Sequence, residues 1–180
     1  LDEFGYKEIY NKELLEIVKD REEKLKKGVL AVEDFTLKNA VIFLEKLHRA
    51  GVKLYLASGT DEEDVRSEAE NLGYDHLFEG RIYGAVGDVN KEAKKIVLDR
   101  ILDMIGESKK GQLAVFGDGP VEIRETHKRG GVTIGVASNE IKRHSLNKSK
   151  RSRLIKAGAD VIIPDFSQLS QLLKLLNVQD

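Results

Sequence analysis

Two apolar runs in this chain are each followed at once by a glycine-containing turn and then by a helix-like segment. The first is Tyr55-Leu56-Ala57-Ser58-Gly59-Thr60, and the second is Val115-Phe116-Gly117-Asp118-Gly119-Pro120. A strand that leads directly into a helix, and does so repeatedly, is the unit from which parallel sheets are built. The pattern therefore predicts an α/β fold and directs attention to the two turns.

The segments around these turns also alternate between helical and strand-like periodicity. Apolar residues recur at helical spacing from Leu37 to Leu47, and the β-rich run 52–57 follows. Thr60 and Glu63 form a capping-box pattern, which predicts that the next helix begins at Thr60. Further strands are expected at 81–83, 113–116, 132–137 and 161–163, and further helices at 91–105, 120–129 and 167–176. We expect a Rossmann-like parallel sheet sandwiched by helices.

The first 34 residues differ from the rest of the chain. The stretch 6–27 is helix-like and heavily charged, with a ragged apolar stripe, and 28–35 has the character of a connector. We therefore divide the chain into an N-terminal helical segment, residues 1–34, and an α/β core, residues 35–180.

Composition excludes several classes of function. Lys and Arg total 30 against 31 Asp and Glu, so the chain lacks the basic excess typical of nucleic-acid binding. Cysteine is absent, which excludes thiolate chemistry, zinc–cysteine sites and disulfide scaffolds. No apolar run approaches the roughly 18 residues of a membrane helix, and the charged N-terminus is not a signal peptide. We expect a cytoplasmic protein that binds neither membranes nor nucleic acid.

The first turn has the features of a small anion site. Ser58 offers a hydroxyl, Gly59 allows the backbone to approach a ligand closely, and the helix expected at Thr60 directs free N–H groups to the same place. A tight turn with an ordinary helix cap is the alternative interpretation, and the three residues alone do not decide between the two.

The second turn places a carboxylate between two glycines at a strand end. Asp118 there could hold Mg²⁺, which prefers oxygen ligands, and Glu122 in the first helical turn could be a direct or water-mediated second ligand. Asp and Gly also favour turns, and Glu favours helix N-termini, so a purely structural role is the alternative.

A lysine between the two turns lies on the apolar face of its helix. Lys94 precedes Val97, Leu98 and Ile101 at helical spacing, whereas lysines usually occupy the opposite face. A lysine stem that covers apolar surface would explain this placement without function. Lys94 could instead balance phosphate and carboxylate charge, with Lys91 and Lys95 as substitutes if the helix is rotated. The basic stretch 142–156 could attract an anionic substrate, but we interpret it as a solvated charged face.

From about Phe35 to the C-terminus, these motifs resemble those of the haloacid dehalogenase-like superfamily of phosphohydrolases. The segment 57–60 is similar to its second motif, Lys94 to its third and the segment 117–122 to its fourth. The resemblance implies that phosphate is bound by Ser58, Gly59, Thr60 and Lys94, that Lys94 is also catalytic, and that Mg²⁺ is held by Asp118 and Glu122. It also implies that residues 1–34 are the remnant of a cap domain.

The first motif of that superfamily, Asp-x-Asp-x-Thr after an apolar strand, does not occur in this sequence. In the superfamily its first Asp attacks phosphorus and its second acts as general acid and base. The sequence begins at Leu1, and Met104 is its only methionine, so we expect the motif upstream of Leu1. Its strand would lie between those ending at Ser58 and Asp118, and a missing N-terminal segment would complete the sheet.

The resemblance implies a Mg²⁺-dependent phosphatase of a small phosphorylated metabolite that works through an aspartyl-phosphate. We expect this 180-residue chain alone to be inactive, because the nucleophile is outside it. Two alternatives remain open: a sugar-phosphate mutase that uses the same residues, and a non-catalytic anion-binding or regulatory module of the same fold.

Overall fold

The structure is a computed structural model. It describes residues 23–86, 93–106, 111–142 and 145–178, with Ile9, Glu13, Glu16, Ile17, Asp20 and Arg21, and at residues 93 and 94 it describes the backbone alone. Contacts between Cα atoms divide the chain into two compact units, Leu1–Thr36 and Leu37–Asp180. The boundary lies close to the division after residue 34 that the sequence suggests.

The first unit is helical where it is described. Every described residue between Ile9 and Lys26 has helical conformation, as the sequence predicts. A short 3₁₀ helix, η1 (Val32–Asp34), follows, and the Asp34 carboxylate accepts a hydrogen bond from the Ala31 N–H at 2.9 Å.

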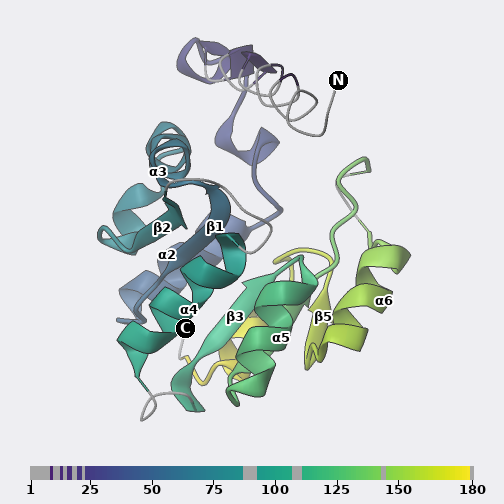
Figure 1. Cartoon of the computed structure of the whole chain (residues 1–180). Coiled ribbons are helices and arrows are strands. Elements are labelled where there is room, and N and C mark those ends of the chain that lie inside the picture. The colour runs from purple at the N-terminus through teal and green to yellow at the C-terminus, as the bar shows by residue number, and fades with distance from the viewer. Residues whose placement is uncertain are drawn as a thin grey trace. The chain divides into compact units, whose positions relative to one another are not determined.

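The second unit contains two parallel sheets (Figure 1). One pairs β1 (Leu56–Asp61) with β2 (Ile82–Ala85). The other has the strand order β3-β4-β5, made by Ala114–Gly117, Val132–Val136 and Val161–Ile163. Within the described residues no strand pairing joins these two sheets. The sequence analysis expects its absent strand between the strands that end at Ser58 and Asp118.

Helices flank both sheets. In Figure 1, α5 and α6 lie in front of the β3-β4-β5 sheet, and α3 packs on the sheet formed by β1 and β2. The helices are α2 (Ala40–Arg49), α3 (Glu62–Asn71), α4 (Ala93–Ile105), α5 (Pro120–Lys128), α6 (Lys148–Ala157) and α7 (Leu169–Leu175), with the 3₁₀ helix η2 (Asp75–Phe78) before β2. Within the described residues, none of these helices is long and apolar enough to cross a membrane.

The core follows the two-residue periodicity of the strands. On β3, Ala114 and Phe116 contact the larger apolar cluster, which also contains residues of α2 and α7, whereas Val115 between them contacts a smaller cluster under α5 and α6. The Phe43 ring packs against the rings of Phe116 and Phe166, each with centroids 5.2 Å away. The larger cluster includes residues of both sheets, so one core supports the whole α/β unit.

Three sequence predictions about elements need correction. The first strand covers Leu56–Asp61 rather than 52–57, because the Ser58–Thr60 turn is part of it. Helix α3 therefore begins later than expected, and its N-cap is Asp61, whose carboxylate accepts a hydrogen bond from the Glu63 N–H at 2.9 Å. The basic stretch 142–156 contains a helix, α6, that the sequence analysis did not predict.

Candidate functional site

The Ser58–Thr60 turn is an interruption in the ladder between β1 and β2. Ala57 pairs with Tyr83 and Asp61 pairs with Ala85, so Ser58, Gly59 and Thr60 together lie opposite Gly84. The Ser58 hydroxyl donates to Thr60 Oγ1 at 3.1 Å and accepts from the Thr60 N–H at 3.2 Å. Three of the four predicted phosphate-binding residues, all except Lys94, thus lie in one compact turn at the carboxyl end of a parallel strand.

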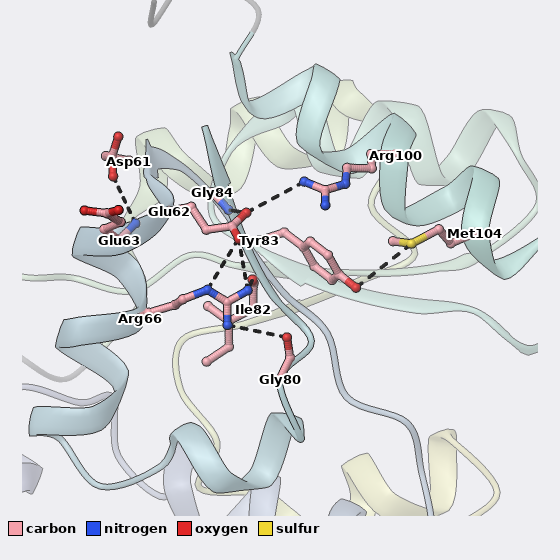
Figure 2. A network of polar contacts seen from close by, with 10 residues as sticks. All are labelled: Asp61, Glu62, Glu63, Arg66, Gly80, Ile82, Tyr83, Gly84, Arg100 and Met104. Atoms are coloured by element: carbon pink, nitrogen blue, oxygen red, sulfur yellow. Dashed lines mark hydrogen bonds and ion pairs between the residues drawn. The ribbon is translucent and has the colours of Figure 1, made fainter. Parts of the chain in front are cut away.

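Glu62 ties this turn to the neighbouring strand. Its Oε2 atom accepts a hydrogen bond from the Gly84 N–H at 3.2 Å, and its Oε1 atom accepts one from the Arg66 guanidinium at 3.0 Å. Arg66 in turn donates to the carbonyl oxygens of Ile82 and Gly80 on the same strand segment. Figure 2 shows Glu62 at the centre of these contacts. The start of α3 and the end of β2 are therefore held together by charge-assisted hydrogen bonds.

Arg100 of α4 adds a second cation on the other side of Glu62. Its Nη1 atom lies 3.7 Å from Glu62 Oε2, and its guanidinium lies 5.0 Å from the centroid of the Tyr83 ring (Figure 2). Burial acts to raise the pKa of Glu62, but the hydrogen bonds from Arg66 and Gly84 and the charges of Arg66 and Arg100 outweigh it and lower this pKa. Glu62 is thus a carboxylate that the surrounding groups hold in its ionised form.

The second turn is shaped by a buried carboxylate. Glu122 is 6% exposed, and its Oε1 atom accepts a hydrogen bond from the Gly119 N–H at 2.9 Å. A Cβ atom at residue 117 would lie 2.3 Å from Glu122 Cγ, and one at residue 119 would lie 2.8 Å from Glu122 Oε2. The two glycines therefore leave the space that Glu122 occupies. Between them Asp118 carries a side chain that is 54% exposed.

A lysine that the sequence analysis did not single out contacts Asp118. Lys150, in the first turn of α6, places its Nζ atom 3.0 Å from Asp118 Oδ2 and also forms a short ion pair with Glu140 Oε1. Burial acts to lower the pKa of Lys150, but the hydrogen bonds to Glu140 and Asp118 raise it overall. Two capping residues in the sequence, Asn147 and Gly158, could have predicted the helix that carries Lys150, because they mark its two ends within the basic stretch.

The packing of α6 explains how Lys150 reaches Asp118. A Cβ atom at Gly135 of β4 would lie 3.1 Å from Leu154 Cβ, so this glycine lets α6 approach the sheet closely. Beyond the helix, the Asp160 carboxylate accepts hydrogen bonds from the Thr133 N–H and hydroxyl, both at 2.8 Å. The helix therefore packs closely against β4, and a part-buried polar contact lies just beyond its C-terminus.

The predicted lysines of α4 are only partly within the described structure. Lys94 lies in α4, but its side chain is outside the described residues, and so is all of Lys91. Lys95, the other substitute, forms an ion pair at 2.8 Å with Asp99 of the same helix, which Arg129 of the segment after α5 also contacts at 2.8 Å. The assignment of a catalytic lysine to Lys94 stays a prediction.

The structure gathers the predicted site residues into two groups. Ser58, Gly59 and Thr60 form the turn in β1, and Asp118 and Glu122 belong to the turn after β3. The first turn lies within a strand of one sheet, and the second turn follows a strand of the other. Each turn lies where ligands bind to open parallel sheets, at the carboxyl end of a strand.

Comparison with known proteins identifies the family. The sequence profile of haloacid dehalogenase-like hydrolases matches residues 3–125. The chain belongs to this family. The match begins well before Phe35, the position from which the motifs alone indicate the resemblance, and it covers both turns.

Solved structures with the same fold include other haloacid dehalogenase-like proteins. A protein of unknown function from Agrobacterium tumefaciens has a TM-score of 0.61 and 18% identity, and it aligns over 78% of this chain and 61% of its own. A hydrolase from Deinococcus radiodurans, solved with phosphate and sodium, has a TM-score of 0.60 and 15% identity over 78% and 60% of the two chains. A candidate phosphatase from Clostridium difficile has a TM-score of 0.62 and 21% identity over 87% and 68%.

A copper-transporting P-type ATPase from Rhizobium leguminosarum is 30% identical over 92 residues, which are 51% of this chain and 9% of the ATPase. The chain thus spans a small part of that relative and about three fifths of the first two solved structures.

The described residues around Asp118 fit a magnesium ion bound mainly through water. Mg²⁺ is commonly held by one or two carboxylates, with water and substrate phosphate as the other ligands. Asp118 offers an accessible carboxylate, and a positively charged ammonium already lies against its Oδ2 atom. Within the described part of the chain, no group of three or more His, Cys, Asp or Glu side chains forms a metal cage. The accessible carboxylate of Asp118 is the kind of protein ligand that Mg²⁺ takes.

Proposed function

We propose that the protein to which this haloacid dehalogenase-like chain belongs is a cytoplasmic, Mg²⁺-dependent phosphatase of a small phosphorylated metabolite. The observation that carries the proposal is the Asp118 carboxylate, exposed at the end of β3 on a turn that Gly117, Gly119 and Glu122 shape around it. Membership of a hydrolase family and the phosphate bound to the Deinococcus radiodurans hydrolase support it.

In this proposal the two turns have different tasks. Asp118 is a protein ligand of Mg²⁺. Glu122, the predicted direct or water-mediated second ligand, is buried and accepts a hydrogen bond from the Gly119 N–H, so it also maintains the shape of the turn. Bound there, Mg²⁺ would neutralise negative charge on the phosphoryl group. The hydroxyls of Ser58 and Thr60, with the backbone at Gly59, bind the phosphoryl oxygens. Lys94 supplies a positive charge that stabilises the transferring group.

The nucleophile and one strand come, in this proposal, from a segment outside the 180 residues. A strand between β1 and β3 would join the two sheets. The first carboxylate of the motif at its end would attack phosphorus, and the second, in its protonated form, would give its proton to the oxygen of the leaving alcohol. Water would then hydrolyse the aspartyl-phosphate and release inorganic phosphate. Residues 1–34 would be the remnant of a cap domain.

A non-catalytic binding module is the second candidate function. The observation that favours it is the absence of Asp-x-Asp-x-Thr from the sequence. Such a module would bind an anion with Mg²⁺ at the same two turns but would not turn it over.

The decisive experiment measures phosphate release from a panel of small phosphorylated metabolites, with Mg²⁺ and with EDTA. It compares the 180-residue chain, the complete reading frame that encodes it, and the Asp118→Asn variant of that complete protein. We expect no release by the 180-residue chain, Mg²⁺-dependent release by the complete protein, and loss of release with an unchanged circular dichroism spectrum in the variant.

Three other results would change the proposal. Activity of the 180-residue chain alone would place the nucleophile within this sequence. Near-normal activity of Asp118→Asn would remove Asp118 from the metal site. Mg²⁺-dependent phosphate binding by the complete protein without turnover of any substrate would favour the binding module.

A further inference from the structure

The ammonium of Lys150 bridges two carboxylates from different parts of the α/β unit. Asp118 follows β3, and Glu140 lies in the segment between β4 and α6. The Lys150 side chain is 14% exposed, whereas those of Asp118 and Glu140 are 54% and 72% exposed. The cation is therefore mostly buried, and the anions that neutralise it face solvent.

This arrangement leaves the three side chains with a net charge of −1. One ammonium cannot neutralise two carboxylates, so the cluster still attracts a further cation. Lys150 contacts an oxygen of Asp118, which is the side chain proposed to bind Mg²⁺. Lys150 and the metal would thus compete for one carboxylate, because the two cations repel each other at such short range.

Glu140 determines how much the Lys150 ammonium is destabilised when Mg²⁺ displaces it from Asp118. A mostly buried ammonium that loses its last carboxylate partner is strongly destabilised. Because Glu140 also contacts Lys150, the ammonium keeps one partner when Asp118 is taken away. Glu140 therefore lowers the free-energy cost of releasing Asp118.

We propose that Lys150 is a built-in counter-ion of Asp118, which Mg²⁺ displaces and which Glu140 then retains. The inference rests on the proposed function in one respect, the choice of Asp118 as the metal ligand. It makes Lys150 and Glu140 positioning residues that set the affinity for the metal without binding it.

The test is a direct binding measurement that needs no substrate. Mn²⁺ is titrated into the protein, the free ion is counted by its electron paramagnetic resonance signal, and Mg²⁺ is added as competitor. We expect Lys150→Met to tighten binding about fivefold, since it removes a partly shielded competing charge. We expect Glu140→Gln to weaken binding by a similar factor, because Lys150 then has Asp118 alone. Lys148→Met, an exposed lysine in the same helical turn, is the matched control and should leave the affinity unchanged.

A double variant separates this role from direct ligation by Glu140. If Glu140 acts through Lys150, then Glu140→Gln has no effect on affinity in the Lys150→Met background. If Glu140 is itself a metal ligand, the substitution weakens binding in both backgrounds, which would overturn the proposal. Glu140 is so exposed that its variant should fold, so Glu140→Gln decides the matter even if Lys150→Met is unstable.

Failure of the counter-ion role and failure of the phosphatase proposal give different results in this experiment. One result would overturn the counter-ion role and leave the phosphatase proposal intact. In that result, Asp118→Asn abolishes metal binding, but Lys150→Met leaves the binding unchanged or weakens it. Absence of metal binding in the wild type and in Lys150→Met overturns both proposals. Binding that appears only when Lys150 is replaced would show that the metal cannot displace the ammonium, and it would overturn the proposed displacement.

Discussion

A Cβ atom on residue 84 would lie 2.4 Å from the Cα atom of Glu62, so Gly84 allows strand β2 to pass directly against the start of α3. The same Cβ atom would lie 2.7 Å from the Thr60 carbonyl oxygen, which belongs to the candidate phosphate-binding turn. Both contacts are with backbone atoms, which cannot rotate away as a side chain can. Gly84 thus couples the edge of β2 to the conformation of the Ser58–Thr60 turn.

Replacement of Gly84 by alanine should therefore destabilise the protein. We expect a loss of about 1–3 kcal/mol in the free energy of unfolding, the usual cost of overpacking. Urea denaturation followed by circular dichroism measures it. Gly111→Ala is the matched control, because a Cβ atom there would meet no atom within 4 Å. Equal stabilities of the two variants would show that β2 and α3 can separate at little cost.

The network around Glu62 should make stability depend on pH. Because the folded protein lowers the pKa of Glu62, the stability that its ionised form contributes is full above the unfolded pKa, near 4.5, and is lost as the pH falls through the lower folded value. Glu62→Gln should cost about 1 kcal/mol at pH 7, and this difference should shrink below pH 4.5. Urea denaturation of both proteins between pH 3 and pH 7 tests this, and a difference that stays constant with pH would contradict it.

The start of α3 illustrates a limit of pattern-based prediction. The sequence analysis places the N-cap at Thr60, because Glu63 follows it at the spacing of a capping box. The structure uses Asp61, because the turn at Ser58–Thr60 is built into β1 and the strand continues to Asp61. A strand interruption depends on the pairing with β2, which the local sequence does not reveal.

The correct cap can be identified by paired substitutions. Asp61→Ala should lower the free energy of unfolding by about 1 kcal/mol, since it removes the acceptor for the Glu63 N–H. Thr60→Ala, one residue earlier, should have a smaller effect on stability. Thermal unfolding of the two variants measures the contrast. If Thr60→Ala were the less stable of the two variants, Thr60 rather than Asp61 would be the N-cap.

The strands were more predictable from the sequence than the contacts at the site. Each of the five strands in the described residues overlaps a strand predicted from the sequence, although β1 begins and ends later than predicted. The alternation of Ala114, Val115 and Phe116 between two clusters shows the physical basis of that prediction. Helix α6 was missed because its buried residues, Leu154 and Ala157, are too few to give a clear apolar stripe. The Lys150–Asp118 contact joins residues 32 positions apart, so it depends on tertiary packing alone.

The turn that carries Asp118 offers the most specific test of the site's construction. The three atoms nearest to a Cβ atom at residue 117 all belong to the Glu122 side chain, and the closest, Cγ, is 2.3 Å away. We expect Gly117→Ala to destabilise the protein by about 1–3 kcal/mol, because Cγ is too close to the helix backbone to move freely. If Glu122 is the cause, the same substitution should cost much less in a Glu122→Ala background, where that side chain is absent.

Such non-additivity is the expected sign of two residues that occupy one space. The free energies of unfolding of Gly117→Ala, Glu122→Ala and the double variant, obtained from urea denaturation, give the coupling directly. We expect a coupling of about 1 kcal/mol or more, with the double variant more stable than the sum of the single effects implies. Strict additivity would mean that Gly117 is required for another reason, such as the backbone conformation at the end of β3, and that Glu122 does not shape the turn around Asp118.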